Sequence, residues 1–267
     1  MKKISDEVYR RINNQVYDSD ELNWWGKDSS FNLIESMLNP VRVNYFKKIL
    51  KHLEIDPSCK SALEVGCGGG LLSEEIYKMG FRTTGIDPSE NALKIAKEHS
   101  DERGLVIEYI KGRGEEIPLR DESFDVVFCC DVLEHVNDLP KVISEVSRVL
   151  VPGGIFLYDT INRTLASKLV VIKIMQEWKK WAILPANLHV WKMFIRPGEM
   201  KELLMNNNLN WKEHRGIKTN LQAFKALRVL HQRVSNKISN EEFSKKMRLV
   251  EGGFQQVSYM GYALKMC

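Results

Sequence analysis

The stretch SALEVGCGGGLLSEEIYKMGFRTTGID, residues 61–87, decides the fold that we expect for this chain. SALEVG is typical of a buried strand, GLLSEEIYKMG of a helix and FRTTGID of a second strand. Gly66, Gly68 and Gly70 connect the first strand to the helix, where they permit a tight turn and the close approach of a ligand to the backbone. This order predicts a βαβ unit with a parallel sheet and a right-handed crossover.

The alternation continues on the C-terminal side of this unit. We expect strands over residues 105–112, 123–130 and 155–162, with helices over 88–104 and 139–150. Beyond residue 162 the pattern changes. We expect a helical insertion over 165–184, a further helix over 194–208 and a strand over 209–217. A charged helical segment over 219–250 and a closing strand over 255–266 follow. The chain is therefore predicted to be one α/β domain over 1–267, with an N-terminal helical extension over 1–55, a ligand-binding core over 61–161, and helical insertions with C-terminal strands over 163–264.

The composition is that of an ordinary globular domain. The chain has 267 residues, of which 43% are apolar and 28% charged. The 39 basic and 35 acidic residues leave a net charge of +4, which is too mild to indicate a nucleic-acid partner. The five cysteines form no CxxC pair, which favours reduced thiols in a cytoplasmic protein. The N-terminus lacks the apolar region of a secretory signal, and no charge-free run has the length of a membrane span.

The glycine loop is followed by an acid at the distance that nucleoside binding requires. Asp87 ends the second strand about 20 residues after the loop, where a carboxylate can accept hydrogen bonds from ribose hydroxyls. Glu64 lies just before the glycines. The spacing G-x-G-x-G differs from the G-x-G-x-x-G of dinucleotide sites, so the site suits a nucleoside without a pyrophosphate. The alternative is a tight structural turn with unrelated acids nearby.

The core resembles the class I S-adenosylmethionine-dependent methyltransferases. The matching motifs are EVGCGGG, GID, EEIPLRDESFDVVFCCDVLEHV and LVPGGIFL, which lie between residues 61 and 161. A narrower resemblance is to the ubiquinone-pathway O-methyltransferases, carried in order by NPVRV, CGGG, DVLEHV, TINR, LHVWKMFIRPGEM and VSYMGYA. It spans about residues 39–264, although residues 219–253 look longer and more helical than that family usually shows.

The resemblance implies a Rossmann-like class I methyltransferase fold. Its sheet would be mostly parallel and seven-stranded, with an antiparallel C-terminal strand and helical insertions. The cofactor would be S-adenosylmethionine, with Arg42 near its methionine carboxylate, Asp87 on its ribose and Cys130 supplying backbone contacts. The full set of cofactor-binding residues that we expect is Arg42, Glu64, Gly66, Cys67, Gly68, Asp87, Pro88, Glu115 and Cys130. Many members of the superfamily carry an Asp near the third strand for adenine, whereas this chain has GRGEE there, so backbone groups or Glu115 would replace it.

DVLEHV, residues 131–136, follows a buried strand and places three reactive groups at its end. The i, i+3, i+4 spacing of Asp131, Glu134 and His135 predicts that one helical turn brings them onto one face. Two roles fit. His135 could take a proton from an acceptor hydroxyl, oriented by a carboxylate, or all three could hold Mg²⁺ against a catechol. The resemblance implies a divalent metal at these three positions, and the structural alternative is that Glu134 and His135 only hydrogen-bond the neighbouring helix.

Two further features follow the core. His189, in LHVWKMFIRP, matches a family segment near the acceptor, which implies a catalytic role; a lone histidine can also be purely structural. The insertion over 165–184 is amphipathic and carries Lys168, Lys173, Lys179 and Lys180. It fits a membrane-surface helix, a lid over an apolar acceptor, or a helix packed on the core.

The expected activity is transfer of a methyl group to a hydroxyl of a small phenolic or catechol-like acceptor. A second hypothesis is methylation of another small molecule at O, N or C, as in secondary metabolism. A third is a non-catalytic cofactor-binding assembly protein that docks on membranes, although a pure binder would not need DVLEHV. We expect a cytoplasmic location, with peripheral membrane contact through the 165–184 helix. The sequence gives no signal for an oligomeric state.

Overall fold

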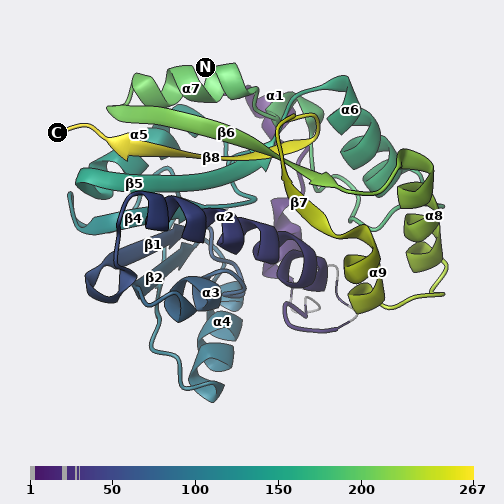
Figure 1. The fold of residues 1–267 in the computed structure, drawn as a ribbon, viewed down its shortest axis with the longest axis horizontal. Helices are drawn as coiled ribbons and strands as arrows, with labels where there is room; N and C mark the ends of the chain where they lie inside the picture. Colours follow the sequence, from purple (N-terminus) through teal and green to yellow (C-terminus); the bar gives the residue numbers. More distant parts are fainter. Residues whose placement is uncertain (1–3, 20–22, 28, 30) are drawn as a thin grey trace.

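A mixed β-sheet runs through the centre of the molecule. The computed structural model describes residues 4–19, 23–27, 29 and 31–267. These residues form one eight-stranded sheet in the order β3-β2-β1-β4-β5-β8-β6-β7 (Figure 1). The strands are β1 Ser61–Val65, β2 Arg82–Asp87, β3 Glu108–Lys111, β4 Phe124–Cys129, β5 Leu150–Ile161, β6 Leu209–Thr219, β7 Leu249–Gly252 and β8 Ser258–Lys265.

The strand order creates a ligand site in the middle of the sheet. β1 pairs in parallel with both β2 and β4, and the β2–β3 and β4–β5 pairs are parallel as well. The chain moves outward from β1 to β3 and then returns to place β4 on the other side of β1. Ligands of such sheets bind beyond the carboxyl ends of the strands where the order reverses. The expected α/β fold is confirmed.

The C-terminal part of the sheet is antiparallel. β8 pairs with β5 and β6, as expected for the closing strand. β7 pairs with the last residues of β6, from Gly216 to Thr219. The described sheet therefore has one strand more than the seven that we expected. β7 has four residues directly after a helix, so it is too short to show the alternation that reveals a strand in a sequence.

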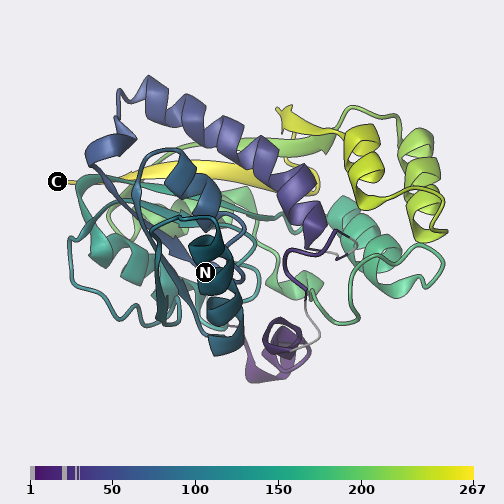
Figure 2. The same cartoon turned by 90° about the horizontal axis from the view of Figure 1, so that it is seen from below.

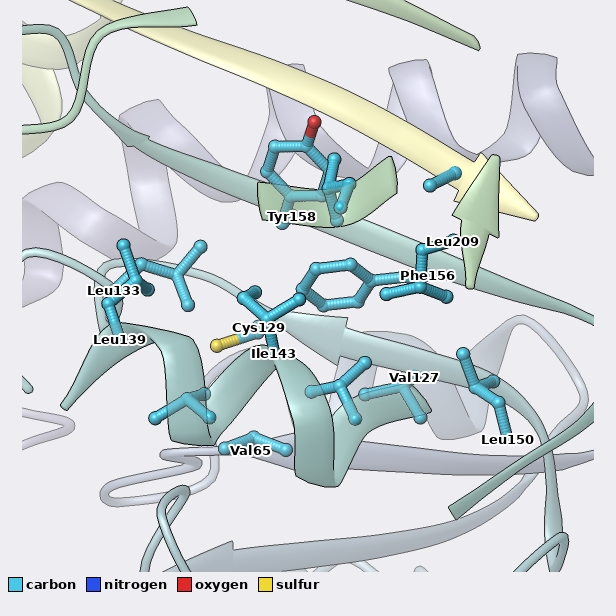
Figure 3. Close-up of a cluster of buried hydrophobic side chains, with 14 of the residues drawn as sticks. Val65, Val127, Cys129, Leu133, Leu139, Ile143, Leu150, Phe156, Tyr158 and Leu209 are labelled. Carbon is cyan, nitrogen blue, oxygen red and sulfur yellow. The ribbon is translucent and has the colours of Figure 1, made fainter. Parts of the chain in front are cut away.

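Helices cover both faces of the central strands, which are accordingly buried on both sides. The covering helices are α2 Asn39–His52, α3 Ser73–Lys78, α4 Glu90–Glu102, α5 Leu139–Val149 and α7 Pro197–Met205. On one face, Ile143 of α5 packs against Cys129 and Phe156 in the apolar cluster of Figure 3. On the other, Phe46 of α2 packs against Phe128 with ring centroids 5.2 Å apart. Cys129 is thus a core residue.

The inserted helices gather beside one end of the sheet (Figures 1 and 2). They are α6 Leu165–Ser167, the π-helix η4 Lys168–Glu177, α8 Ala223–Val234 and α9 Asn240–Met247. The helix expected over 165–184 therefore ends at Glu177, and η4 has the i→i+5 hydrogen bonds of a π-helix. Gln176 is buried and exchanges hydrogen bonds with the backbone of His189.

The N-terminal extension is only partly helical. It contains α1 Asp6–Tyr9, the 3₁₀ turn η1 Asn14–Asp18 and the π-helical turn η2 Ile34–Leu38, which leads into α2. The 3₁₀ turns η3 Pro57–Cys59 and η5 Trp191–Met193 connect other elements. Among the residues described here, no helix is both long and apolar enough to cross a bilayer.

Candidate active site

A cavity of about 430 Å³ lies at the carboxyl ends of β1, β2 and β4. Its walls come from the glycine loop after β1, the end of β2, the segment after β3, the start of DVLEHV and the N-terminal extension. Every residue that we expected to bind the cofactor lines this cavity, namely Arg42, Glu64, Gly66, Cys67, Gly68, Asp87, Pro88, Glu115 and Cys130. The tertiary structure therefore brings together residues that are far apart in the sequence, from Arg42 to Cys130.

The glycine loop is shaped by conformations that other residues adopt with difficulty. Gly66, Gly68 and Gly70 have φ angles of 75°, 50° and 86°. A Cβ at Gly66 would lie 2.3 Å from Val132, so the loop and DVLEHV touch only because a side chain is missing there. The carboxylate of Asp87 accepts hydrogen bonds of 2.9 Å from the N–H groups of Gly68 and Ser89. The loop is thus a cradle of backbone that fits a nucleoside ligand.

Burial raises the pKa values of two acids that face this cavity. Burial raises the pKa of Glu64 to about 8, although its carboxyl accepts a hydrogen bond from Ser73. Burial also raises the pKa of Asp87, but the N–H groups that bind its carboxylate oppose that shift. Burial therefore favours the neutral, protonated form of Glu64. Gly112 to Glu115, the segment expected near adenine, lines the same cavity, and the Glu115 carboxylate accepts a hydrogen bond from the Asn137 N–H at 3.1 Å.

Arg42 is held by acids of the protein itself. Its guanidinium contacts Asp131 at 2.5 Å and also pairs with Asp159 of β5, while its Nη1 donates to Asn39 at 3.3 Å. All three guanidinium nitrogens are therefore engaged. Arg42 lines the cavity as expected, and its contact with the methionine carboxylate stays a prediction, but the structure gives it a second role as the partner of two buried or half-buried acids.

DVLEHV does not form the helical turn that we predicted. Residues 131–136 make a non-helical turn, with Asp131 at a φ of 55°. Its N–H donates to Asp159 at 2.9 Å and its carboxylate turns to Arg42. Glu134 instead accepts a hydrogen bond from Thr160 at 2.7 Å. The prediction of one shared face was wrong because the tertiary pairing with Arg42 and Asp159 outweighs the local helical spacing.

The polar cluster of the site consists of Glu134, His135 and His189. One ligand atom from each lies within 4.8 Å of the other two, and Asp131 is not a member of this group. Glu134 Oε1, His135 Nε2 and His189 Nδ1 are buried and have no hydrogen-bond partner among the described residues. Such atoms cost free energy unless a ligand or ion satisfies them. His189, which sequence alone placed only near the acceptor, therefore joins the pair from DVLEHV.

Burial controls the charges of this cluster. Burial, reinforced by the negative charge of Asp131, raises the pKa of Glu134 to about 8. Burial lowers the pKa of His189 to about 4 and that of His135 well below its usual value. Burial thus favours the neutral form of all three groups. The neutral imidazoles of the cluster offer nitrogen lone pairs, which can accept a proton or bind a metal ion.

Several residues of the site were not identified from the sequence. Asp159 interrupts an otherwise apolar strand, and a charge in such a position could have signalled it. Tyr17 and Trp24 also line the cavity, but the polar N-terminal stretch around them has no periodicity that would place them there.

The comparisons with known proteins agree with this geometry. Residues 63–158 match the family model described as a methyltransferase domain. A ubiquinone biosynthesis O-methyltransferase of Marinobacter nauticus is 37% identical over 220 residues, covering 78% of this chain and 89% of that protein. The protein of that name from Rickettsia bellii is 33% identical over 198 residues, covering 74% of this chain and 81% of that protein. A crystal structure of a Thermotoga maritima SAM-dependent methyltransferase, described as a possible histamine N-methyltransferase, shares the fold with a TM-score of 0.59, at 18% identity over 97% of this chain and 98% of that chain.

The cradle, the acid that follows it and the matched domain define an S-adenosylmethionine-dependent methyltransferase, and its fold is the Rossmann-like fold that we expected. Two relatives that are more than 30% identical over more than four-fifths of their own length identify the family within this class. The chain belongs to the family of ubiquinone biosynthesis O-methyltransferases.

Proposed function

We propose that this enzyme methylates a hydroxyl of a phenolic or catechol-like acceptor with a polyprenyl tail, as in ubiquinone biosynthesis. The single observation that carries the proposal is the cluster of Glu134, His135 and His189, two of them buried and His189 partly buried, next to the cofactor cavity. An acceptor hydroxyl must lose its proton as its oxygen attacks the methyl group, and these groups supply the atoms that can take or share it. The names of the relatives support the acceptor class.

The reaction is a direct displacement. The acceptor oxygen forms a bond to the methyl carbon while the carbon–sulfur bond breaks, and the electron pair of that bond leaves with a neutral thioether. Holding the two substrates in line supplies much of the acceleration. His135 contributes to both parts of the site, because it lines the cofactor cavity and belongs to the polar cluster.

A divalent ion would fit among Glu134, His135 and His189. The fit rests on two observations: one possible ligand atom of each residue converges within 4.8 Å of the others, and each residue has a buried polar atom without a hydrogen-bond partner in the described chain. A bound ion would polarise the acceptor hydroxyl and lower its pKa. Two imidazoles with one carboxylate suit Zn²⁺, Fe²⁺ or Mn²⁺ better than Mg²⁺, which prefers oxygen ligands. The expected Mg²⁺ set of Asp131, Glu134 and His135 is not assembled, because Asp131 is paired with Arg42.

The test is a screen of prenylated catechols, prenylated phenols and amines with labelled S-adenosylmethionine. Turnover of a hydroxylated acceptor, and none of an amine, is the expected result. His189→Gln and Glu134→Gln should lower turnover at least tenfold while the affinity for the cofactor product stays within about twofold of wild type. His52→Gln, at an exposed position of α2, is the control. Full turnover in both cluster variants would contradict the proposal.

A chelator separates the two roles of the cluster. Loss of activity on dialysis against a chelator, restored by Zn²⁺, Fe²⁺ or Mn²⁺, is expected if an ion is held there. The competing role is that His135 acts alone as a general base, favoured by its neutral imidazole. In that case the chelator has no effect and His189→Gln retains activity.

Peripheral membrane contact through the insertion is part of the proposal, since a polyprenyl acceptor resides in a bilayer. Leu165, Leu169 and Trp178 are exposed, the first by 79% and the other two by 49% each. The lysines at 168, 173, 179 and 180 accompany them, which suits an anionic lipid surface. The opposite side of the insertion packs on the protein, with Val171 and Ile172 buried. This arrangement combines core packing and an interfacial face, and it supports a cytoplasmic enzyme at the membrane surface.

A further inference from the structure

The N-terminal extension is fastened to the cofactor cradle by two adjacent tryptophans. Trp25 donates its indole N–H to the carbonyl of Gly69 at 2.9 Å. Its ring stacks on His99 of α4, with centroids 3.5 Å apart and planes 11° from parallel. Trp24 is buried, and a Cβ added at Gly68 would lie 2.4 Å from its ring. The two rings therefore clamp the described part of the extension onto the glycine loop.

The clamp places Tyr17 between the cofactor cavity and the polar cluster of Glu134, His135 and His189. Tyr17 lines the cofactor cavity, and its ring meets that of His135 edge-on, with centroids 5.7 Å apart and planes at 82°. Trp24 stacks beside it at 6.2 Å. Asn14, on the same 3₁₀ turn, donates to the carbonyl of His135 at 3.1 Å. In Figure 2 the purple N-terminal turns lie outside the sheet, next to the helices of the cofactor-binding half.

The surroundings of Tyr17 favour a positive ligand. Five acidic side chains line the described cavity, those of Asp18, Glu64, Asp87, Glu115 and Asp131, and burial favours the neutral form of Glu64. The other four face two basic side chains, Arg42 and Arg113. Arg42 is already paired with two acids. Burial, reinforced first by the charge of Asp131, raises the pKa of Tyr17, so its ring stays neutral and keeps a negative π-face. A cation against such a face gains more when it is removed from water.

The cofactor carries its charge where the methyl group is transferred. The sulfonium of S-adenosylmethionine is positive, and the thioether left after transfer is neutral. His135, one of the groups at the acceptor side, is the residue that Tyr17 contacts. We propose that the ring face of Tyr17 contacts the sulfonium of the bound cofactor, so that the N-terminal extension helps the enzyme to distinguish the methyl donor from its demethylated product. This inference rests on the cofactor and not on the identity of the acceptor.

The test compares the dissociation constants of S-adenosylmethionine and S-adenosylhomocysteine by calorimetry, with no acceptor present. Tyr17→Leu removes the π-face. It should weaken the binding of S-adenosylmethionine about 3- to 30-fold more than the binding of S-adenosylhomocysteine. Tyr17→Phe keeps the ring and should leave the ratio of the two constants within about twofold of wild type. Thermal melting of each variant shows whether the fold is retained.

Trp25→Leu tests the clamp. Trp25 holds the extension through Gly69 and His99, so its loss should displace Tyr17 and shift the ratio of the two dissociation constants in the same direction as Tyr17→Leu, and by no more. An unchanged ratio in Tyr17→Leu would overturn the inference and leave Tyr17 a structural residue. A ratio that shifts equally in Tyr17→Phe would overturn it too, because the π-face of Tyr17 would then not be the cause.

Discussion

Replacing Gly66 by Ala tests the contact between the glycine loop and DVLEHV. The new methyl group would lie 2.3 Å from one methyl of Val132 and 3.2 Å from the other. Two costs add. The positive φ of 75° costs about 1–2 kcal/mol for a residue with a Cβ, and overpacking adds typically about 1–3 kcal/mol. The expected loss of stability is therefore about 2–5 kcal/mol.

Gly153→Ala separates these two costs. Gly153 has nearly the same φ, 77°, but no described atom lies within 4 Å of the position that its Cβ would take. Only the conformational cost applies there, so about 1–2 kcal/mol is expected. Chemical denaturation gives both values from the shift of the midpoint, provided that the slope of the transition is unchanged.

A second substitution identifies the atoms responsible. Val132→Ala removes both methyl groups that the new Cβ would meet, so the double variant Gly66→Ala/Val132→Ala should recover most of the overpacking cost. The single variant Gly66→Ala should also bind S-adenosylhomocysteine more weakly, because Val132 lines the cavity into which it would be pushed. Equal destabilisation by Gly66→Ala and Gly153→Ala, or no recovery in the double variant, would refute the reasoning.

Three further predictions concern single groups. The pKa of Glu64 is raised to about 8, so the folded state holds a proton that the unfolded state releases, and stability is lost as the pH rises from about 4.5 towards 8. Glu64→Gln should weaken that loss in the ligand-free enzyme, and parallel stability–pH curves for both proteins would contradict the assignment. Asp87→Ala should weaken S-adenosylmethionine binding by about 1–3 kcal/mol, and the wild type should not bind NAD; calorimetry decides both points. Trp178→Ala should reduce recovery of the protein on anionic vesicles without a change in melting temperature. Trp181→Ala should instead destabilise the inserted helices, because Trp181 packs among their buried residues. Equal recovery of Trp178→Ala and wild type would exclude the membrane contact.

The sequence by itself determined the fold class and identified residues that line the cavity. Strand, glycine loop, helix and Asp87 lie within 27 consecutive residues, so local patterns of hydrophobicity and turn chemistry suffice to identify them. The same patterns indicated that DVLEHV carries reactive groups, because it follows a buried strand whose carboxyl end faces the ligand site. Short-range order of this kind depends on the types and spacing of neighbouring residues, which the sequence shows directly.

Only the tertiary structure decided which partners those groups take. Asp131 has the right spacing to join Glu134 and His135, yet it pairs with Arg42, and His189 takes its place in the cluster. Tyr17 reaches the cavity across more than 100 residues of intervening sequence to meet His135. These pairings depend on burial. A charge removed from water must find an opposite charge, and the nearest one is set by how the sheet and its helices pack, which no local pattern records.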